Sequence, residues 1–146
     1  MTVMIEVNLK ELRCLDSSGD TFPESPNQLE IRGGLGVSVG TTATGPGNRE
    51  SHTLFRKPDN QGVEVYPSNP LVLNSRKQFE VRPNEFVWIG GVLVEEDGAS
   101  ADDSLGDQRP NISFIEFNNM TDPFRKAVRF SSTGQVIEAI YEFRRV

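Results

Sequence analysis

Cysteine and histidine are almost absent from this chain, which has one of each, Cys14 and His52. A single cysteine cannot form an internal disulfide, and one cysteine with one histidine does not make a zinc site of the usual kind. A catalytic triad would have to use His52, which stands at the start of an expected strand, far in sequence from Cys14. Since no general base or nucleophile stands out, we expect a protein that is not an enzyme.

Long apolar runs are also missing, which excludes a transmembrane helix. The first residues, MTVMIEVNLK, enter an alternating pattern without a charged leader. No Sec-type signal peptide is visible, so we expect a cytoplasmic protein or one exported by a leaderless route. The formal net charge of -6 argues against nucleic acid, which needs clustered Lys and Arg. The length of 146 residues fits one domain, 1–146, whose core needs no disulfide or metal.

Glycine and proline are plentiful, with 13 Gly and 9 Pro, and the apolar residues between them alternate with period two. In the first strand, residues 3–14, the apolar parity changes after Leu9, which indicates a bulge near Lys10 and Glu11. We predict an all-β fold: an antiparallel sandwich of eight strands (seven to nine), with at most one short helix between Met120 and Lys126. The later candidate strands lie at 29–39, 52–56, 63–66, 71–73, 78–81, 86–94, 112–117, 127–130 and 136–144. The last strand should turn one face to the core, formed by Ile137, Ala139, Tyr141 and Phe143.

Residues 95–107 (EEDGASADDSLGD) hold six acidic side chains and no basic one. Without them the chain has 15 acids (21 − 6) against 15 bases, so this segment carries the whole charge imbalance. Two carboxylates about 5 Å apart repel by roughly 3 kcal/mol at an effective dielectric of 20. The segment is therefore either a solvated spacer or a site for something positive. Calcium takes about six to eight oxygen ligands, and the spacing of Glu95, Asp97 and Asp103 around a tip of small residues could supply several.

Two stretches, VNLKELRCLDSSGD (residues 7–20) and SPNQLEI (25–31), resemble the opening of a C2 domain or of a bacterial C2-like relative. A third stretch, VLVEEDGASADDSLG (92–106), is similar to the third loop of that family. Its pattern is acid, any residue, acid, a gap with a serine, then Asp-x-aliphatic-Gly. C2 domains are eight-stranded antiparallel sandwiches, and many bind two or three calcium ions between these loops. The resemblance implies a Ca²⁺ site made by Asp16 or Asp20, Asn27, Glu95, Asp97, Ser100 and Asp103.

Two departures from the family pattern favour one ion over three. Asn27 would coordinate as a neutral amide where the family has a carboxylate, and Glu95 stands where the family has aspartate. Membrane docking, the usual use of calcium in this family, needs basic or bulky apolar loop tips. The third-loop tip is Gly-Ala-Ser-Ala (98–101), and Phe22 is the only plausible inserting side chain.

We therefore favour a protein or glycan partner over lipid, and expect calcium to order a recognition surface. Arg76 and Lys77, like Arg56 and Lys57, are basic pairs that could contact lipid phosphate or an acidic partner. The alternative is a structural or assembly subunit of a larger complex, whose acidic loop is solvated and holds no metal.

Two other features have simple structural interpretations. The segments 33–36 (GGLG) and 45–47 (GPG) lack the Lys and Ser/Thr of a phosphate loop, so their glycines are assigned to bulges and turns. Trp88 lies in an apolar stretch and is expected in the core rather than as a ligand platform.

Overall fold

The structure is a computed structural model, which describes residues 1–18, 28–96 and 101–146. These ranges contain ten strands and one short helix. Eight strands have six or more residues, and two have three. In chain order the elements are β1 (Val3–Asp16), β2 (Leu29–Gly40), β3 (Glu50–Lys57), β4 (Val63–Val65), β5 (Leu71–Val81), β6 (Phe86–Glu95), β7 (Asp103–Gln108), β8 (Asn111–Ser113), α1 (Phe114–Asn119), β9 (Phe124–Ser132) and β10 (Gln135–Arg145).

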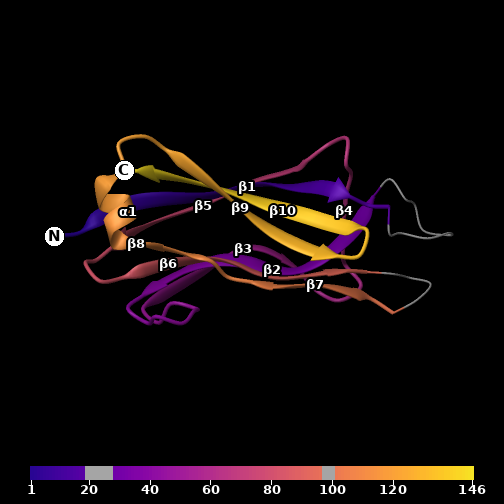
Figure 1. Cartoon of the computed structure of the whole chain (residues 1–146), viewed down its shortest axis with the longest axis horizontal. Helices are drawn as coiled ribbons and strands as arrows, with labels where there is room; N and C mark the ends of the chain where they lie inside the picture. Colours follow the sequence, from indigo (N-terminus) through magenta and orange to yellow (C-terminus); the bar gives the residue numbers. More distant parts are fainter. Residues whose placement is uncertain (19–27, 97–100) are drawn as a thin grey trace.

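The strands form two antiparallel sheets that pack face to face (Figure 1). One sheet has the order β5-β1-β10-β9. The other has the order β3-β2-β6-β7, with β4 added to β2 and β8 added to β6. This arrangement confirms the predicted all-β antiparallel sandwich.

The core lies between the sheets and follows from the alternation of the strands. The four apolar residues assigned to the inner face of β10 are fully buried, and their partners on β1 are buried too. The predicted bulge is confirmed, because the register of β1 shifts between Leu9 and Glu11 against both of its neighbours. After this shift Leu12 and Cys14 return to the core.

Tyr141 connects the two sheets through the core. Its hydroxyl donates to the carbonyl oxygen of Gly36 on β2 (2.9 Å) and accepts the amide hydrogen of Gly90 on β6 (3.1 Å). Burial raises the pKa of Tyr141 far above its ordinary value, so the hydroxyl keeps its proton. Gly90 has φ 94°, and a Cβ there would lie 2.0 Å from the carbonyl oxygen of Gln108, so this position requires glycine.

A second connection joins two loops at the end of the molecule that carries the chain termini. The carboxylate of Glu85, which is 3% exposed, accepts two hydrogen bonds from Arg49, at 2.6 and 2.9 Å. It also accepts one from the amide of Arg82 (2.8 Å). The Arg49 guanidinium is the main reason why the pKa of Glu85 lies below its ordinary value of 4.5.

The short helix lies earlier in the chain than expected. α1 covers 114–119, and its start is marked by the Ser113 amide, which donates to the Glu116 carboxylate (2.9 Å). The expected strand at 112–117 is therefore reduced to the three residues of β8. The expected helix at 120–126 was wrong, because Phe124 already pairs with Phe143 in the β9–β10 ladder.

Two strands extend into polar sequence that did not look like strand. The candidates at 71–73 and 78–81 are one continuous strand, β5, at the edge of its sheet. The second half of the acidic run also enters a strand, since β7 begins at Asp103.

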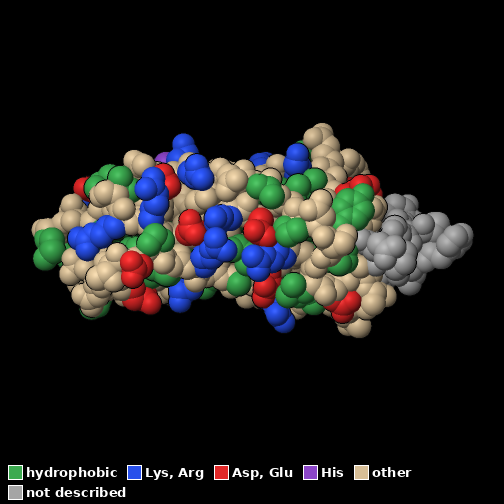
Figure 2. Space-filling model, turned by 90° about the horizontal axis from the view of Figure 1, so that it is seen from above, with side chains coloured by type: hydrophobic (Ala, Val, Ile, Leu, Met, Phe, Trp, Pro, Cys, Tyr) green, Lys and Arg blue, Asp and Glu red, His purple; other side chains and the backbone are tan. Residues whose placement is uncertain are grey.

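The outer face of the four-stranded sheet carries basic and acidic side chains side by side (Figure 2). Examples are the ion pairs of Arg144 with Glu6 (2.8 Å) and of Arg125 with Glu142 (3.1 Å). Within the part of the chain that the structure describes, no helix has the length and apolar character needed to cross a membrane.

Candidate functional site at the loop end of the sandwich

Several strands begin or end at the end of the sandwich opposite the chain termini, called here the loop end (Figure 1). β1 and β6 end there, and β2 and β7 begin there. The antiparallel ladders explain this, because Ile31 near the start of β2 pairs with Glu95 at the end of β6. Two acidic segments, the run of residues 95–107 and the segment that begins at Asp16, are therefore brought to the same end of the molecule.

Glu95 and Asp103 are the sequence-predicted residues that the structure brings together most directly. They are opposite each other in the β6–β7 ladder, so their side chains lie on the same face, toward the other sheet. Glu95 is only 2% exposed. One of its carboxylate oxygens accepts from the Glu30 amide (3.1 Å), and the other lies 3.5 Å from the Gln135 side-chain nitrogen on β10. Glu95 thus helps to close the end of the sandwich.

Asp16 lies at the same end, at the last position of β1. Its carboxylate accepts the amide hydrogen of Ser18 (2.9 Å), and this hydrogen bond lowers the pKa of Asp16. In the ladder Asp16 pairs with Val136, the neighbour of the buried Gln135. Alternation along β10 puts Val136 on the outer face, so Asp16 and the Glu95–Asp103 pair belong to different faces of their sheets.

Arg32 is a residue at this end whose position the sequence did not reveal. Its guanidinium lies 2.9 Å from Asp59, 3.1 Å from Asp102 and 3.9 Å from Glu96. The contact with Asp59 also places the β3–β4 turn at this end. Arg32 has no basic neighbour in sequence, and it is far from every acid that it contacts. Its proximity to the acidic run follows only from the β2–β6 pairing, which puts Arg32 opposite Val94, next to that run.

Arginines therefore contact three acids of the run of residues 95–107. Glu96 and Asp102 share Arg32, and Asp107 contacts Arg109 at 2.7 Å. A run that looked uncompensated in sequence is partly neutralised in space by residues from outside it.

The other sequence-predicted site residues form two groups. Asp20, Phe22, Asn27, Asp97 and Ser100 lie outside the described residues. Arg76 and Lys77 lie midway along β5 in the four-stranded sheet, where they pair with Asn8 and Val7 of β1. Arg76 lies 4.0 Å from Glu6, within the charged face of that sheet.

The described ranges 1–18, 28–96 and 101–146 contain only part of a ligand set for a metal ion. In them no group of three or more His, Cys, Asp or Glu side chains could hold one. Glu95 and Asp103 supply two carboxylates, and that of Glu95 already accepts the Glu30 amide hydrogen. A calcium site would therefore need ligands from 19–27 and 97–100.

The candidates for catalysis are also apart. His52 on β3 contacts Glu50 at 2.5 Å, whereas Cys14 is buried in the core on β1, in the other sheet. Trp88 is buried as expected, at 8% exposure, but it lies on the outer face of its sheet. The loop containing Gly45 covers it, since a Cβ on Gly45 would lie 2.5 Å from the indole ring.

Comparison with solved structures gives this architecture a family likeness. The chain superimposes on a C2 domain protein from Ramazzottius varieornatus with a TM-score of 0.50 and 13% identity, over 99% of this chain and 89% of that one. The fold is C2-like. The paired C2 domains of extended synaptotagmin 2, in a calcium-bound structure, give a TM-score of 0.52 and 11% identity, over 98% of this chain and 45% of that one.

The C2-like chain is also similar to human GIVD cytosolic phospholipase A2, with a TM-score of 0.52 and 14% identity. The likeness covers 99% of this chain but only 15% of that enzyme. No protein-family model matches the sequence, and no curated protein matches it either. The structural superpositions establish the fold, and at these low sequence identities they do not establish the function.

Proposed function

We propose that the chain is a non-enzymatic binding module whose loop end takes up one Ca²⁺ and so orders a recognition surface for a protein or glycan partner. The observation that carries the proposal is the pairing of Glu95 with Asp103 at the end where both acidic segments meet. The calcium-bound state of the similar C2 domains of extended synaptotagmin 2 adds support.

In this proposal Asp103 is the described ligand with a carboxylate that can turn to an ion. Glu95 completes the inner wall, and Asp16 adds negative charge at the same end from the outer face of its sheet. The remaining oxygens would come from Asp20, Asn27, Asp97 and Ser100. Bound calcium would supply positive charge that removes the repulsion among these carboxylates, and the loops that carry them would then hold one arrangement.

A second function is favoured by Arg32. Its contacts with Asp59, Asp102 and Glu96 already supply a positive charge to the acidic run. A structural or assembly subunit would need no more than this, because the paired acids keep the loop end ordered and charged without a metal. In that case the same end would dock on a basic surface of another subunit.

Thermal melts in excess EDTA and in millimolar calcium distinguish the two functions. A ligand at 100 times its Kd stabilises the folded state by about 2.7 kcal/mol. For a domain of this size that raises Tm by about 5–10 °C. The Asp97→Asn/Asp103→Asn double variant should lose the shift, and Asp122→Asn, an exposed acid outside the loop end, should keep it.

An unchanged Tm in calcium sinks the metal-binding function and leaves the assembly subunit. A shift that survives in the double variant means that the ion binds elsewhere. For the partner class, co-sedimentation with anionic vesicles in calcium should give no binding, and binding there would reverse the preference for protein or glycan over lipid.

A further inference from the structure

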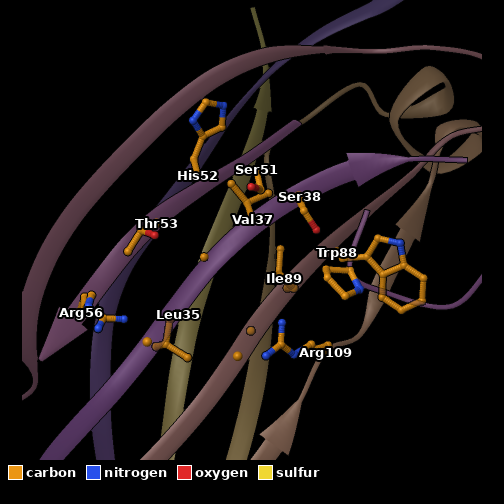
Figure 3. Close-up of a pocket in the computed structure, with 15 residues that line it drawn as sticks. Leu35, Val37, Ser38, Ser51, His52, Thr53, Arg56, Trp88, Ile89 and Arg109 are labelled. Atoms are coloured by element: carbon orange, nitrogen blue, oxygen red, sulfur yellow. The ribbon is translucent and has the colours of Figure 1, made fainter. Parts of the chain in front are cut away.

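A shallow cavity of about 260 Å³ lies on the outer face of the β3-β2-β6-β7 sheet, away from the loop end. Its floor is formed by strands β2 and β6, where Gly34, Gly36 and Gly90 present backbone instead of side chains. β3 forms one side with Ser51 and Thr53 (Figure 3). Trp88 closes one end (Figure 3), and Pro46 also lines the cavity.

The fold requires two of these glycines but not the third. A Cβ on Gly36 would lie 2.5 Å from the His52 carbonyl oxygen, and Gly90 has a positive φ. At Gly34 the nearest atom to a Cβ is the Phe55 carbonyl oxygen at 3.8 Å, an ordinary contact, and the backbone is not left-handed. Glycine in a strand interior weakens the strand, so Gly34 keeps the cavity open at a cost to stability that the fold does not demand.

The charge of the cavity is opposite to that of the chain. Arg56 and Arg109 stand on either side of the floor (Figure 3), and no Asp or Glu is among the described residues that line it. The chain as a whole, by contrast, has 21 acids and 15 bases. Arg109 contacts Asp107, whereas Arg56 has no ion-pair partner within the described ranges. A guanidinium facing a cavity is suited to bind a carboxylate through two parallel hydrogen bonds.

The remaining polar groups of the cavity suit a ligand with hydroxyl groups. Ser51 and Thr53 add side-chain hydroxyls to the wall. The volume is below the range of about 300–1,000 Å³ that drug-sized ligands occupy, so the cavity fits about one sugar ring.

We propose that this cavity binds an acidic monosaccharide, one hydroxylated ring that carries a carboxylate. Arg56 holds the carboxylate, Arg109 adds positive charge from the other side of the floor, and the ring lies over the bare backbone at Gly34. Ser51 and Thr53 bind ring hydroxyls. The site is independent of the calcium proposed above, because it uses another face of the sandwich. The sugar is either free or the terminal residue of a glycan.

The test uses the single tryptophan as a reporter, by following the Trp88 indole N–H signal in two-dimensional NMR. The full chain is titrated in EDTA with glucuronate, with N-acetylneuraminate and with glucose as the neutral control. At least one of the two acids should give a saturable shift, and glucose should give none. A glycan that ends in the same acid should compete if glycans are the source.

Three variants locate the site. Gly34→Val fills the floor and should abolish the shift, and Arg56→Gln should weaken binding by about tenfold or more. Arg129→Gln removes an exposed arginine from the outer face of the β5-β1-β10-β9 sheet, and this variant should bind like the original chain. Melting curves establish that each variant is folded, and Arg56→Gln still tests the site if Gly34→Val does not fold.

The inference is overturned if neither acid gives a saturable shift, or if glucose binds as well as the acids. Unchanged binding in Arg56→Gln overturns it too. The inference is also overturned if the soluble sugars do not bind and anionic lipid vesicles bind through Arg56, because the occupant would then be a membrane.

Discussion

Replacing Glu85 by Gln should remove a buried negative charge from a position where three hydrogen bonds converge. Gln has nearly the same shape, but it cannot accept both bonds from Arg49 and the bond from the Arg82 amide. Hydrogen bonds to charged groups contribute about 1.5–3 kcal/mol each. Arg49 is partly exposed and can turn to water, so we expect a loss of about 2 kcal/mol in the free energy of unfolding. For a domain of this size, that lowers Tm by about 4–8 °C.

The effect should depend on pH, and its sign follows from the pKa. The folded-state pKa of Glu85 is below its ordinary value of 4.5, so the ionised carboxylate stabilises the folded chain above about pH 4.5. This contribution is lost as the pH falls through the lowered pKa. The difference in Tm between Glu85→Gln and the original chain should therefore be largest at pH 7 and shrink in acid.

Thermal unfolding followed by circular dichroism at pH 7, 5 and 3 measures this difference. Glu80→Gln is the matched control, because Glu80 accepts from Arg82 on the surface, where an ion pair contributes at most about 1 kcal/mol. The reasoning is refuted if Glu85→Gln and Glu80→Gln melt alike at pH 7. A difference that stays constant from pH 7 to pH 3 would refute its electrostatic origin.

Two further predictions concern β2. Gly34→Ala should stabilise the chain by about 0.5–1 kcal/mol, while Gly36→Ala should destabilise it because its Cβ would clash with the His52 carbonyl oxygen; urea unfolding measures both, and equal effects would contradict the geometry. Arg32→Gln should cost about 1 kcal/mol at low salt, since Asp59, Asp102 and Glu96 then repel without a cation. Raising NaCl from about 50 to 500 mM should narrow that loss by screening, and a loss that does not change with salt would assign it to packing.

The sequence was sufficient for the strands whose alternation is regular. β10 buries every residue that period two assigned to the core, and the parity change in β1 located a bulge that both neighbouring ladders contain. The strand ends at the acidic segments were also predicted, and with them the end of the sandwich where those segments meet.

The sequence did not predict several other features, for identifiable physical reasons. Leu105 is the only buried residue of β7, so its acidic neighbours hid the strand. The apolar spacing around Phe114 and Phe117 suggested a strand, although the Ser113–Glu116 pair marks a helix start. Arg32 and the glycine-floored cavity depend on which strands are neighbours, and the apolar pattern along one strand does not show its neighbours. The metal-ligand roles of all the predicted site residues stay predictions, namely those of Asp16, Asp20, Asn27, Glu95, Asp97, Ser100 and Asp103.

The hydroxyl of Tyr141 has a consequence for how the molecule opens. The amide of Gly90 donates to a side chain from the opposite sheet rather than to a neighbouring strand. Fraying of a strand end leaves that bond intact, and only separation of the two layers breaks it. Exchange of this one amide hydrogen with water therefore follows the parting of the sheets, while most other amides report the opening of their own ladder.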